Sequence, residues 1–256
     1  MLDKYVHCCF DRPGNEKPSE IACSIDVYFA TTDDLISEYP ELERFIDLND
    51  RLRADRFHFD DDRNTWLFCH TLLRLVLASE LGIKHSALKI IADKNNKPWL
   101  DGNDLFFNIS HTRDAFVFAV SSSSRVGIDI EKIKPAFDFR AIIRNFFSDE
   151  EARFIMADPG RSRELFFLLW TRKEALLKAL GTGIINRLTD VNVSGDLNLL
   201  NRKSFENIAT DDFFSDYFIY SGTILDYYLS IAIPHTAKII FKHLGTENIR
   251  DLMKGQ

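Results

Sequence analysis

Two acidic residues in the segment VGIDIE, Asp129 and Glu131, are spaced in a way that could support chemistry. The apolar residues of this segment alternate as in a strand, so both carboxylates share one face, about 6–7 Å apart. Oxygens at that spacing can bind one hard cation, directly or through water. Gly127, on the same face, leaves room for a ligand to approach the backbone. An amphipathic strand with a solvated acidic face explains the same pattern without a ligand.

A second segment, WTRKEALLK, has a helical pattern. Trp170, Glu174 and Lys178 are spaced four residues apart and therefore share one helical face. If that face lies opposite the acidic strand, Glu174 adds a third carboxylate and Lys178 adds an ammonium one turn further on. Such a group around Mg²⁺ would form a phosphoryl-transfer site. A surface Glu–Lys pair beside a core tryptophan is the plainer alternative.

Three shorter motifs are ambiguous by themselves. Ser110 and His111 are adjacent on a predicted strand and point to opposite faces, so they form no catalytic dyad, although both can donate hydrogen bonds to a phosphate. A structural histidine fits equally well. Lys97 places an ammonium in the turn 95–98, which alone is typical of a generic hairpin. Ser148 and Glu151 form a capping box, S-x-x-E, which accounts for Glu151 without any ligand.

The elements that must position these residues follow from apolar periodicity and capping signals. Pro40 is expected to break the helical residues 33–58, residues 60–63 to form a turn, and the tail after Gly245 to be peripheral. Helices are predicted at residues 64–82, 148–157 and 162–180. Strands are predicted at residues 21–30, 88–93, 105–110, 115–121, 126–133, 189–194, 216–225 and 227–233. This order favours an α+β class rather than regular βαβ alternation.

Taken together, these motifs have the order and spacing seen in 4′-phosphopantetheinyl transferases, and residues 50–185 resemble the larger, Sfp-type branch of that family. The resemblance implies transfer of the phosphopantetheine arm of coenzyme A to a serine of an acyl, peptidyl or aryl carrier protein, with release of adenosine 3′,5′-bisphosphate. It also implies two similar α+β halves related by a pseudo-twofold axis, with coenzyme A between them. We therefore expect an N-terminal half at 1–121, a C-terminal half with the metal site at 122–245, and a tail at 246–256.

The resemblance also assigns roles, residue by residue. The magnesium carboxylates are matched by Asp129, Glu131 and Glu174. Glu174 is also a candidate for the base that activates the carrier serine, and Lys178 matches a lysine that contacts the phosphates and can protonate the leaving group. The positions that hold coenzyme A phosphates are matched by Lys97, Ser110 and His111. Arg53 lies where the family has a basic residue near the nucleotide.

The sequence departs from the family pattern at two places. The family usually has an arginine nine residues before the helix arginine matched here by Arg74, and this chain has Thr65 there. Arg63 could substitute for it from the start of the helix, or one phosphate contact is missing. Asn96 replaces the usual glycine before Lys97, and asparagine tolerates the left-handed conformation that the turn requires. These departures bear on coenzyme A affinity more than on the type of reaction.

Composition limits the partners. The 256 residues carry a net charge of −7, which disfavours general nucleic-acid binding. Residues 51–100 nevertheless hold nine basic and six acidic residues, and this local excess suits docking of an acidic carrier protein. The longest apolar run is six residues, far below a membrane span. We expect no secretory signal, because Asp3, Lys4, Asp11 and Arg12 interrupt any apolar run near the start. Four cysteines without a C-x-x-C pair indicate reduced thiols. We expect a cytoplasmic monomer that binds neither nucleic acid nor membrane.

Two other functions fit the same residues. A non-catalytic module could keep the fold and bind coenzyme A or a nucleotide without transferring anything. A Mg²⁺-dependent hydrolase could cleave a nucleotide pyrophosphate without a carrier protein. The chain has no G-x-x-x-x-G-K-[ST] motif, which argues against ordinary nucleoside-triphosphate chemistry.

Overall fold

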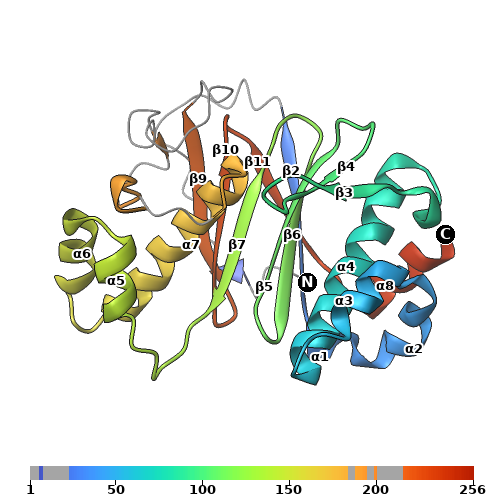
Figure 1. The fold of residues 1–256 in the computed structure, drawn as a ribbon, viewed down its shortest axis with the longest axis horizontal. Coiled ribbons are helices and arrows are strands. Elements are labelled where there is room, and N and C mark those ends of the chain that lie inside the picture. Colours follow the sequence, from blue (N-terminus) through green and yellow to red (C-terminus); the bar gives the residue numbers. More distant parts are fainter. Residues whose placement is uncertain (1–5, 8–22, 184–187, 195–198, 201–215) are drawn as a thin grey trace.

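A computed structural model describes residues 6–7, 23–183, 188–194, 199–200 and 216–256 of the chain. Two sheets lie in the middle of the molecule, and the two long helices, α4 (Asp60–Leu81) and α7 (Ser162–Leu180), lie on opposite outer sides (Figure 1). One set of buried residues fills the space between the sheets, among them Val27, Val117 and Ile231. Two further cores lie under α4 and under α7. The fold is α+β, as predicted.

The N-terminal half is built on a four-stranded sheet with the order β11-β2-β6-β5. Its strands are β2 (Ser24–Thr31), β5 (Phe106–His111), β6 (Ala115–Ser121) and β11 (Lys238–His243). β11 is parallel to β2, and the other neighbours are antiparallel. A two-stranded hairpin accompanies the sheet, formed by β3 (Ile90–Ala92) and β4 (Pro98–Leu100). Its other helices are α1 (Thr32–Leu35), α2 (Tyr39–Leu42), α3 (Leu48–Ala54) and α8 (Thr246–Lys254).

The C-terminal half is built on a sheet with the order β1-β9-β10-β7, and β8 also pairs with β9. Its strands are β1 (Val6–His7), β7 (Gly127–Lys132), β8 (Leu199–Leu200), β9 (Tyr217–Ile224) and β10 (Tyr227–Ile233). Its helices are α5 (Arg140–Phe146), α6 (Asp149–Met156) and α7. Each half thus has a long helix followed by an antiparallel strand pair, β5–β6 or β9–β10. This arrangement agrees with two similar halves.

The ends of the long helices follow from local chemistry. α7 spans the predicted residues and ends at Gly181, whose φ of 72° is the left-handed conformation that glycine adopts most readily. α4 begins at Asp60, so the predicted turn at 60–63 is wrong. Three aspartates fill its first turn, where the positive end of the helix dipole stabilises carboxylates.

Residues 33–58 are broken into short helical pieces, as predicted, and one of them, α2, begins with Pro40 in its first turn, where a missing backbone N–H is tolerated. Two other predicted features differ from the structure. Residues 189–194 form no strand; a 3₁₀ turn, Leu188–Asp190, is followed by irregular chain. The tail is not peripheral, because α8 buries Ile249 completely in the core under α4, and Arg250 pairs with the buried Glu38 at 2.9 Å.

The two ends of the chain also cross between the halves. β11 and α8 complete the N-terminal half, although the predicted boundaries assign them to the C-terminal half and the tail. β1, from the N-terminal end, pairs instead with β9 of the C-terminal sheet.

The remaining expectations concern redox state and membranes. Cys23 and Cys69 are free thiols, while Cys8 and Cys9 lie outside the described residues. None of the described helices combines the length and hydropathy needed to cross a bilayer.

Candidate functional site

The candidate site lies where β5 and β7, the edge strands of the two sheets, come together (Figure 1). Side chains of β5 bridge to the backbone of β7. Asn108 Oδ1 accepts a hydrogen bond from Ile128 N at 2.8 Å, and Ser110 Oγ accepts one from Ile130 N at 3.4 Å. Ser110 Oγ also donates to Asp129 Oδ1 at 2.8 Å. These bonds fix Asp129 at the junction of the two halves, where it is 5% exposed.

Gly127 brings α7 against β7. A Cβ at this position would lie 2.0 Å from Ala175 O and 2.4 Å from Ala179 N, which is closer than atoms can approach. The expectation that Gly127 leaves room for a ligand is therefore wrong, because the helix backbone takes that space. The close approach matters for the site because the helix carries Glu174 and Lys178 beside the acidic strand.

Lys178 connects the two halves. Its Nζ donates to Asp129 Oδ1 at 2.6 Å and to Ser110 Oγ at 2.8 Å. The other oxygen of Asp129, Oδ2, and Oε1 of Glu174 are buried and have no hydrogen-bond partner among the described residues. A buried carboxylate oxygen without a partner is costly, so the site has unsatisfied capacity for a cation or a donor group.

Two carboxyl groups beside Asp129 have raised pKa values. Burial, reinforced by the charge of Asp129, raises the pKa of Glu131 to about 7. The same two causes, in the same order, raise the pKa of Glu174 to about 7. Strongly shifted carboxyl groups that share a charged neighbour are typical of functional sites. Near neutral pH each group can therefore hold or release a proton.

The chemistry of these side chains suits the binding of a hard cation. Among the described residues, no group of three or more His, Cys, Asp or Glu side chains has the arrangement of a formed metal site. The donor set around Asp129 nevertheless consists of carboxylates, which Mg²⁺ prefers, and it includes two unpartnered buried oxygens. The residues that would hold the ion are Asp129, Glu131 and Glu174.

Two of the predicted phosphate-binding residues of the N-terminal half, Arg53 and His111, contact the same tryptophan ring. His111 ends β5, and its ring makes an edge contact with Trp66, at 5.9 Å between ring centroids. The guanidinium of Arg53 lies 4.7 Å above the Trp66 ring. Burial and then the charge of Lys178 lower the pKa of His111. Arg53 and His111 thus adjoin the same Trp66 ring.

Thr65, which replaces the usual family arginine, and the nearby Arg63 and Arg74 all contact other residues of the protein. Thr65 Oγ1 is buried and donates to Arg113 O at 2.8 Å, so this side chain links α4 to the β5–β6 turn. Arg63 lies 3.7 Å from Asp55, and Arg74 lies 3.2 Å from Asp50. Whether Arg63 replaces the family arginine stays a prediction.

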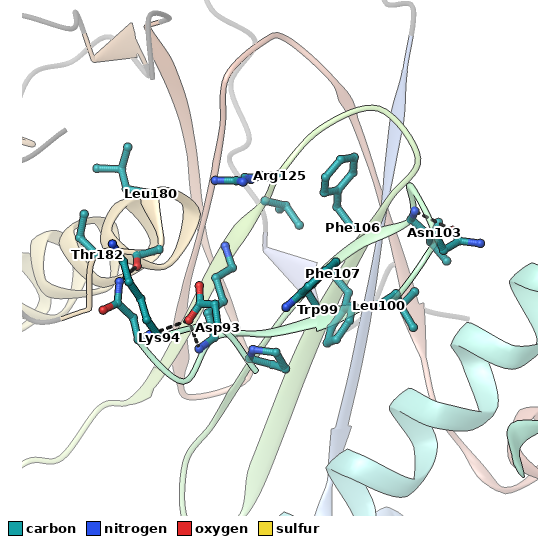
Figure 2. A pocket seen from close by; sticks show the side chains of 16 residues that line it. Asp93, Lys94, Trp99, Leu100, Asn103, Phe106, Phe107, Arg125, Leu180 and Thr182 are labelled. Atoms are coloured by element: carbon teal, nitrogen blue, oxygen red, sulfur yellow. Dashed lines mark hydrogen bonds between the residues drawn. The ribbon is translucent and has the colours of Figure 1, made fainter. Parts of the chain in front are cut away.

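Lys97 lies at the C-terminal end of α7. It lines a cavity of about 590 Å³ between the turn 93–98 and the end of α7. Figure 2 shows Trp99, Phe106, Arg125, Leu180 and Thr182 around this cavity. The Lys97 ammonium donates to Lys178 O at 2.5 Å, so it contacts the backbone of the helix rather than the acidic groups.

One buried ion pair of the C-terminal half was not predicted from the sequence. Lys173 Nζ lies 2.8 Å from Glu151 Oε2, and both side chains are completely buried. Lys173 also donates to Leu188 O and Val191 O, and Glu151 Oε1 accepts from Val193 N at 2.9 Å. The pair therefore attaches residues 188–193 to α6 and α7. Its only signal in the sequence is a lysine on the apolar side of a helical pattern, and the capping box explained Glu151 by a local role that the structure also contains.

Several known 4′-phosphopantetheinyl transferases are similar to this chain in sequence. A 4′-phosphopantetheinyl transferase HetI of Nostoc sp. is 31% identical over 153 residues, which cover 58% of this chain and 65% of the relative. A 4′-phosphopantetheinyl transferase of Bacillus pumilus is 35% identical over 146 residues, 56% of this chain and 61% of the relative. The 4′-phosphopantetheinyl transferase Sfp of Bacillus subtilis is 32% identical over 142 residues, which cover 55% of this chain and 62% of the relative. The match spans less than two thirds of each of these relatives.

Family models cover more of the chain. Residues 125–232 match the model for the 4′-phosphopantetheinyl transferase superfamily, and residues 35–123 match the model for 4′-phosphopantetheinyl transferase, N-terminal. The two matches adjoin one another and correspond to the two halves of the fold. Together they span most of the chain, which therefore belongs to the 4′-phosphopantetheinyl transferase superfamily.

Proposed function

We propose that this protein transfers the 4′-phosphopantetheine arm of coenzyme A to a serine of an apo carrier protein and releases adenosine 3′,5′-bisphosphate. The observation that carries the proposal is the convergence of Asp129, Ser110 and Lys178 across the seam between the halves. A strand carboxylate, a helix ammonium and a hydroxyl from the other half meet there, beside carboxyl groups with raised pKa values. Membership of the superfamily supports the same reaction.

Mg²⁺ is proposed as the cofactor, held by Asp129, Glu131 and Glu174. When bound, it would neutralise charge on the diphosphate of coenzyme A. Lys178 is proposed to contact the same diphosphate and to give a proton to the departing phosphate. Ser110 orients Lys178 through the bond at 2.8 Å. Transfer of a phosphoryl-type group depends mostly on such positioning and charge.

Glu174 is proposed as the base. A serine hydroxyl attacks the β-phosphorus only when a neighbouring group accepts its proton. Glu174 has a buried, unpartnered oxygen that can receive this proton. The new serine–phosphate bond then forms while the bond to adenosine 3′,5′-bisphosphate breaks.

The remaining binding residues and partners are proposed from the resemblance. Coenzyme A phosphates would contact Ser110, His111 and Arg53, and Lys97 matches the same group of family positions. The protein partner would be an acidic acyl or peptidyl carrier protein, and the enzyme would act as a cytoplasmic monomer. The proposal for the phosphate contacts is supported by the position of Arg53 and His111, which both adjoin the Trp66 ring.

The test is to incubate the protein with coenzyme A, Mg²⁺ and apo carrier proteins and to weigh each carrier by mass spectrometry. We expect the added mass of phosphopantetheine on one serine. Glu174→Gln should abolish transfer while circular dichroism stays unchanged. Glu164→Gln, on the exposed side of the same helix, is the matched control and should retain activity.

The other functions give different results in the same assay. A binding module would bind coenzyme A in calorimetry and modify none of the carriers. A pyrophosphate hydrolase would cleave coenzyme A when no carrier is present. Full activity of Glu174→Gln would contradict the proposed base and the three-carboxylate site.

A further inference from the structure

The last turn of α7 needs hydrogen-bond donors from outside the helix. The final carbonyls of any α-helix have no partner within it. Here Gly181 N and Thr182 N both donate to Leu177 O, so they satisfy one carbonyl between them. The carbonyls of Lys178, Ala179 and Gly181 follow it and require other donors.

Those donors come from the turn between β3 and β4, in the other half of the molecule. Lys97 Nζ donates to Lys178 O at 2.5 Å and to Ala179 O at 3.4 Å. Asn95 Nδ2 donates to Gly181 O at 2.6 Å. An ammonium at this end of a helix also interacts favourably with the helix dipole. Two neighbouring side chains of one turn therefore cap the helix that carries Lys178.

The turn is held in shape by its own bonds. Asp93 Oδ1 accepts from Asn95 N at 2.8 Å and from Lys97 N at 2.9 Å, and Asp93 N donates to Lys97 O at 3.0 Å. Asn96 adopts a left-handed φ of 63°, the conformation that asparagine tolerates. A turn fixed in this way can hold the helix end in one position.

We infer that Lys97 and Asn95 form a cap across the two halves that positions Lys178, and that Lys97 acts on coenzyme A binding through this helix end. The inference rests on the proposed function for the role of Lys178. Lys178 is then held at both ends by the N-terminal half: its carbonyl by Lys97, and its ammonium by Ser110 at 2.8 Å.

Charge supports this assignment. Burial and the nearby Arg125 lower the pKa of Lys97 to about 8, so the ammonium persists at neutral pH although it is partly buried. Its two carbonyl partners offset the loss of water. In the same turn, Lys94 is exposed and provides a matched control.

The first experiment measures amide hydrogen exchange in the protein without coenzyme A or a carrier. We expect Lys97→Met and Asn95→Ala to speed exchange of residues 177–182 by about fivefold, because a cap of this kind is worth about 1 kcal/mol. Lys94→Met should leave exchange unchanged. A direct phosphate ligand would have no effect in the free protein, so unchanged exchange in Lys97→Met would overturn the inference.

The second experiment asks whether Lys97 acts through Lys178. Affinity for coenzyme A is measured by calorimetry in wild type, Lys97→Met, Lys178→Met and the double variant. We expect the loss caused by Lys97→Met to vanish when Lys178 is already replaced, whereas two independent phosphate contacts would give additive losses. Additivity would therefore overturn the inference. Neither experiment requires transfer, so an inactive protein would count against the proposed function and leave the cap testable.

Discussion

At the scale of single residues, the site combines groups that are each unfavourable in a folded core. Asp129 is almost completely buried and has one unpartnered oxygen, and Glu174 has another. Within the part of the chain that the structure describes, Lys178 balances this charge directly, at 2.6 Å from Asp129 Oδ1. Proteins keep such arrangements where a function requires them, since an apolar core would be more stable.

The raised pKa values of Glu131 and Glu174 predict how stability depends on pH. Both pKa values rise from 4.5 in the unfolded chain to about 7 in the folded protein. The folded state therefore binds protons more tightly, and without metal it loses stability as pH rises through the interval between these values. Thermal unfolding of the metal-free protein at a series of pH values measures this loss, and Glu174→Gln should reduce it.

Mg²⁺ should reverse that trend, because the ion must displace the same protons. The increase in unfolding temperature caused by Mg²⁺ should be larger at about pH 8 than at about pH 6. The control is Glu164→Gln, which should respond as wild type does. An equal increase at both pH values would contradict the assignment of these carboxyl groups to the metal.

At the scale of elements, the contact between β7 and α7 determines the site. Gly127 permits this contact, since a Cβ would meet backbone atoms of Ala175 and Ala179 that cannot rotate away. We expect Gly127→Ala to lower the free energy of unfolding by about 2–4 kcal/mol and to reduce transfer, because α7 must shift. Urea denaturation measures the first effect.

Gly160→Ala is the matched control for that substitution. Its Cβ would meet only the Asp158 side chain, at 3.3 Å, and this side chain can move. If Gly127→Ala were as stable as Gly160→Ala, the close packing of α7 on β7 would not be what places Glu174 and Lys178.

The long elements could be predicted from the sequence, whereas the contacts between them could not. The apolar periodicity of α7 and the glycine after it indicate both ends of the helix, and the alternation in β7 indicates which side of the strand is apolar. The partner of Gly127 depends on the approach of two elements, which no local pattern records. Lys97 was similarly ambiguous, because a lysine in a turn carries no periodicity and its carbonyl partners belong to the other half.

At the scale of the whole molecule, the halves exchange their ends. β11 runs parallel to β2, and α8 places Ile249 in the core under α4. The sequence could not indicate this exchange, because strand pairing between opposite ends of a chain depends on topology rather than on local composition. The predicted N-terminal unit, residues 1–121, therefore lacks one strand of its sheet and part of its core.

This exchange predicts that residues 1–121 do not fold by themselves. Without β11, the backbone of β2 has an unpaired edge, and without α8 the core loses Ile249, whose removal alone is worth about 2–5 kcal/mol. Circular dichroism and urea denaturation of that fragment should show no cooperative transition. The same fragment joined by a flexible linker to residues 234–256 should regain one, and Lys254→Ala in that fusion should be neutral because Lys254 is exposed. Cooperative unfolding of residues 1–121 alone would mean that the chain's last strand and helix are accessory to the N-terminal half rather than part of it.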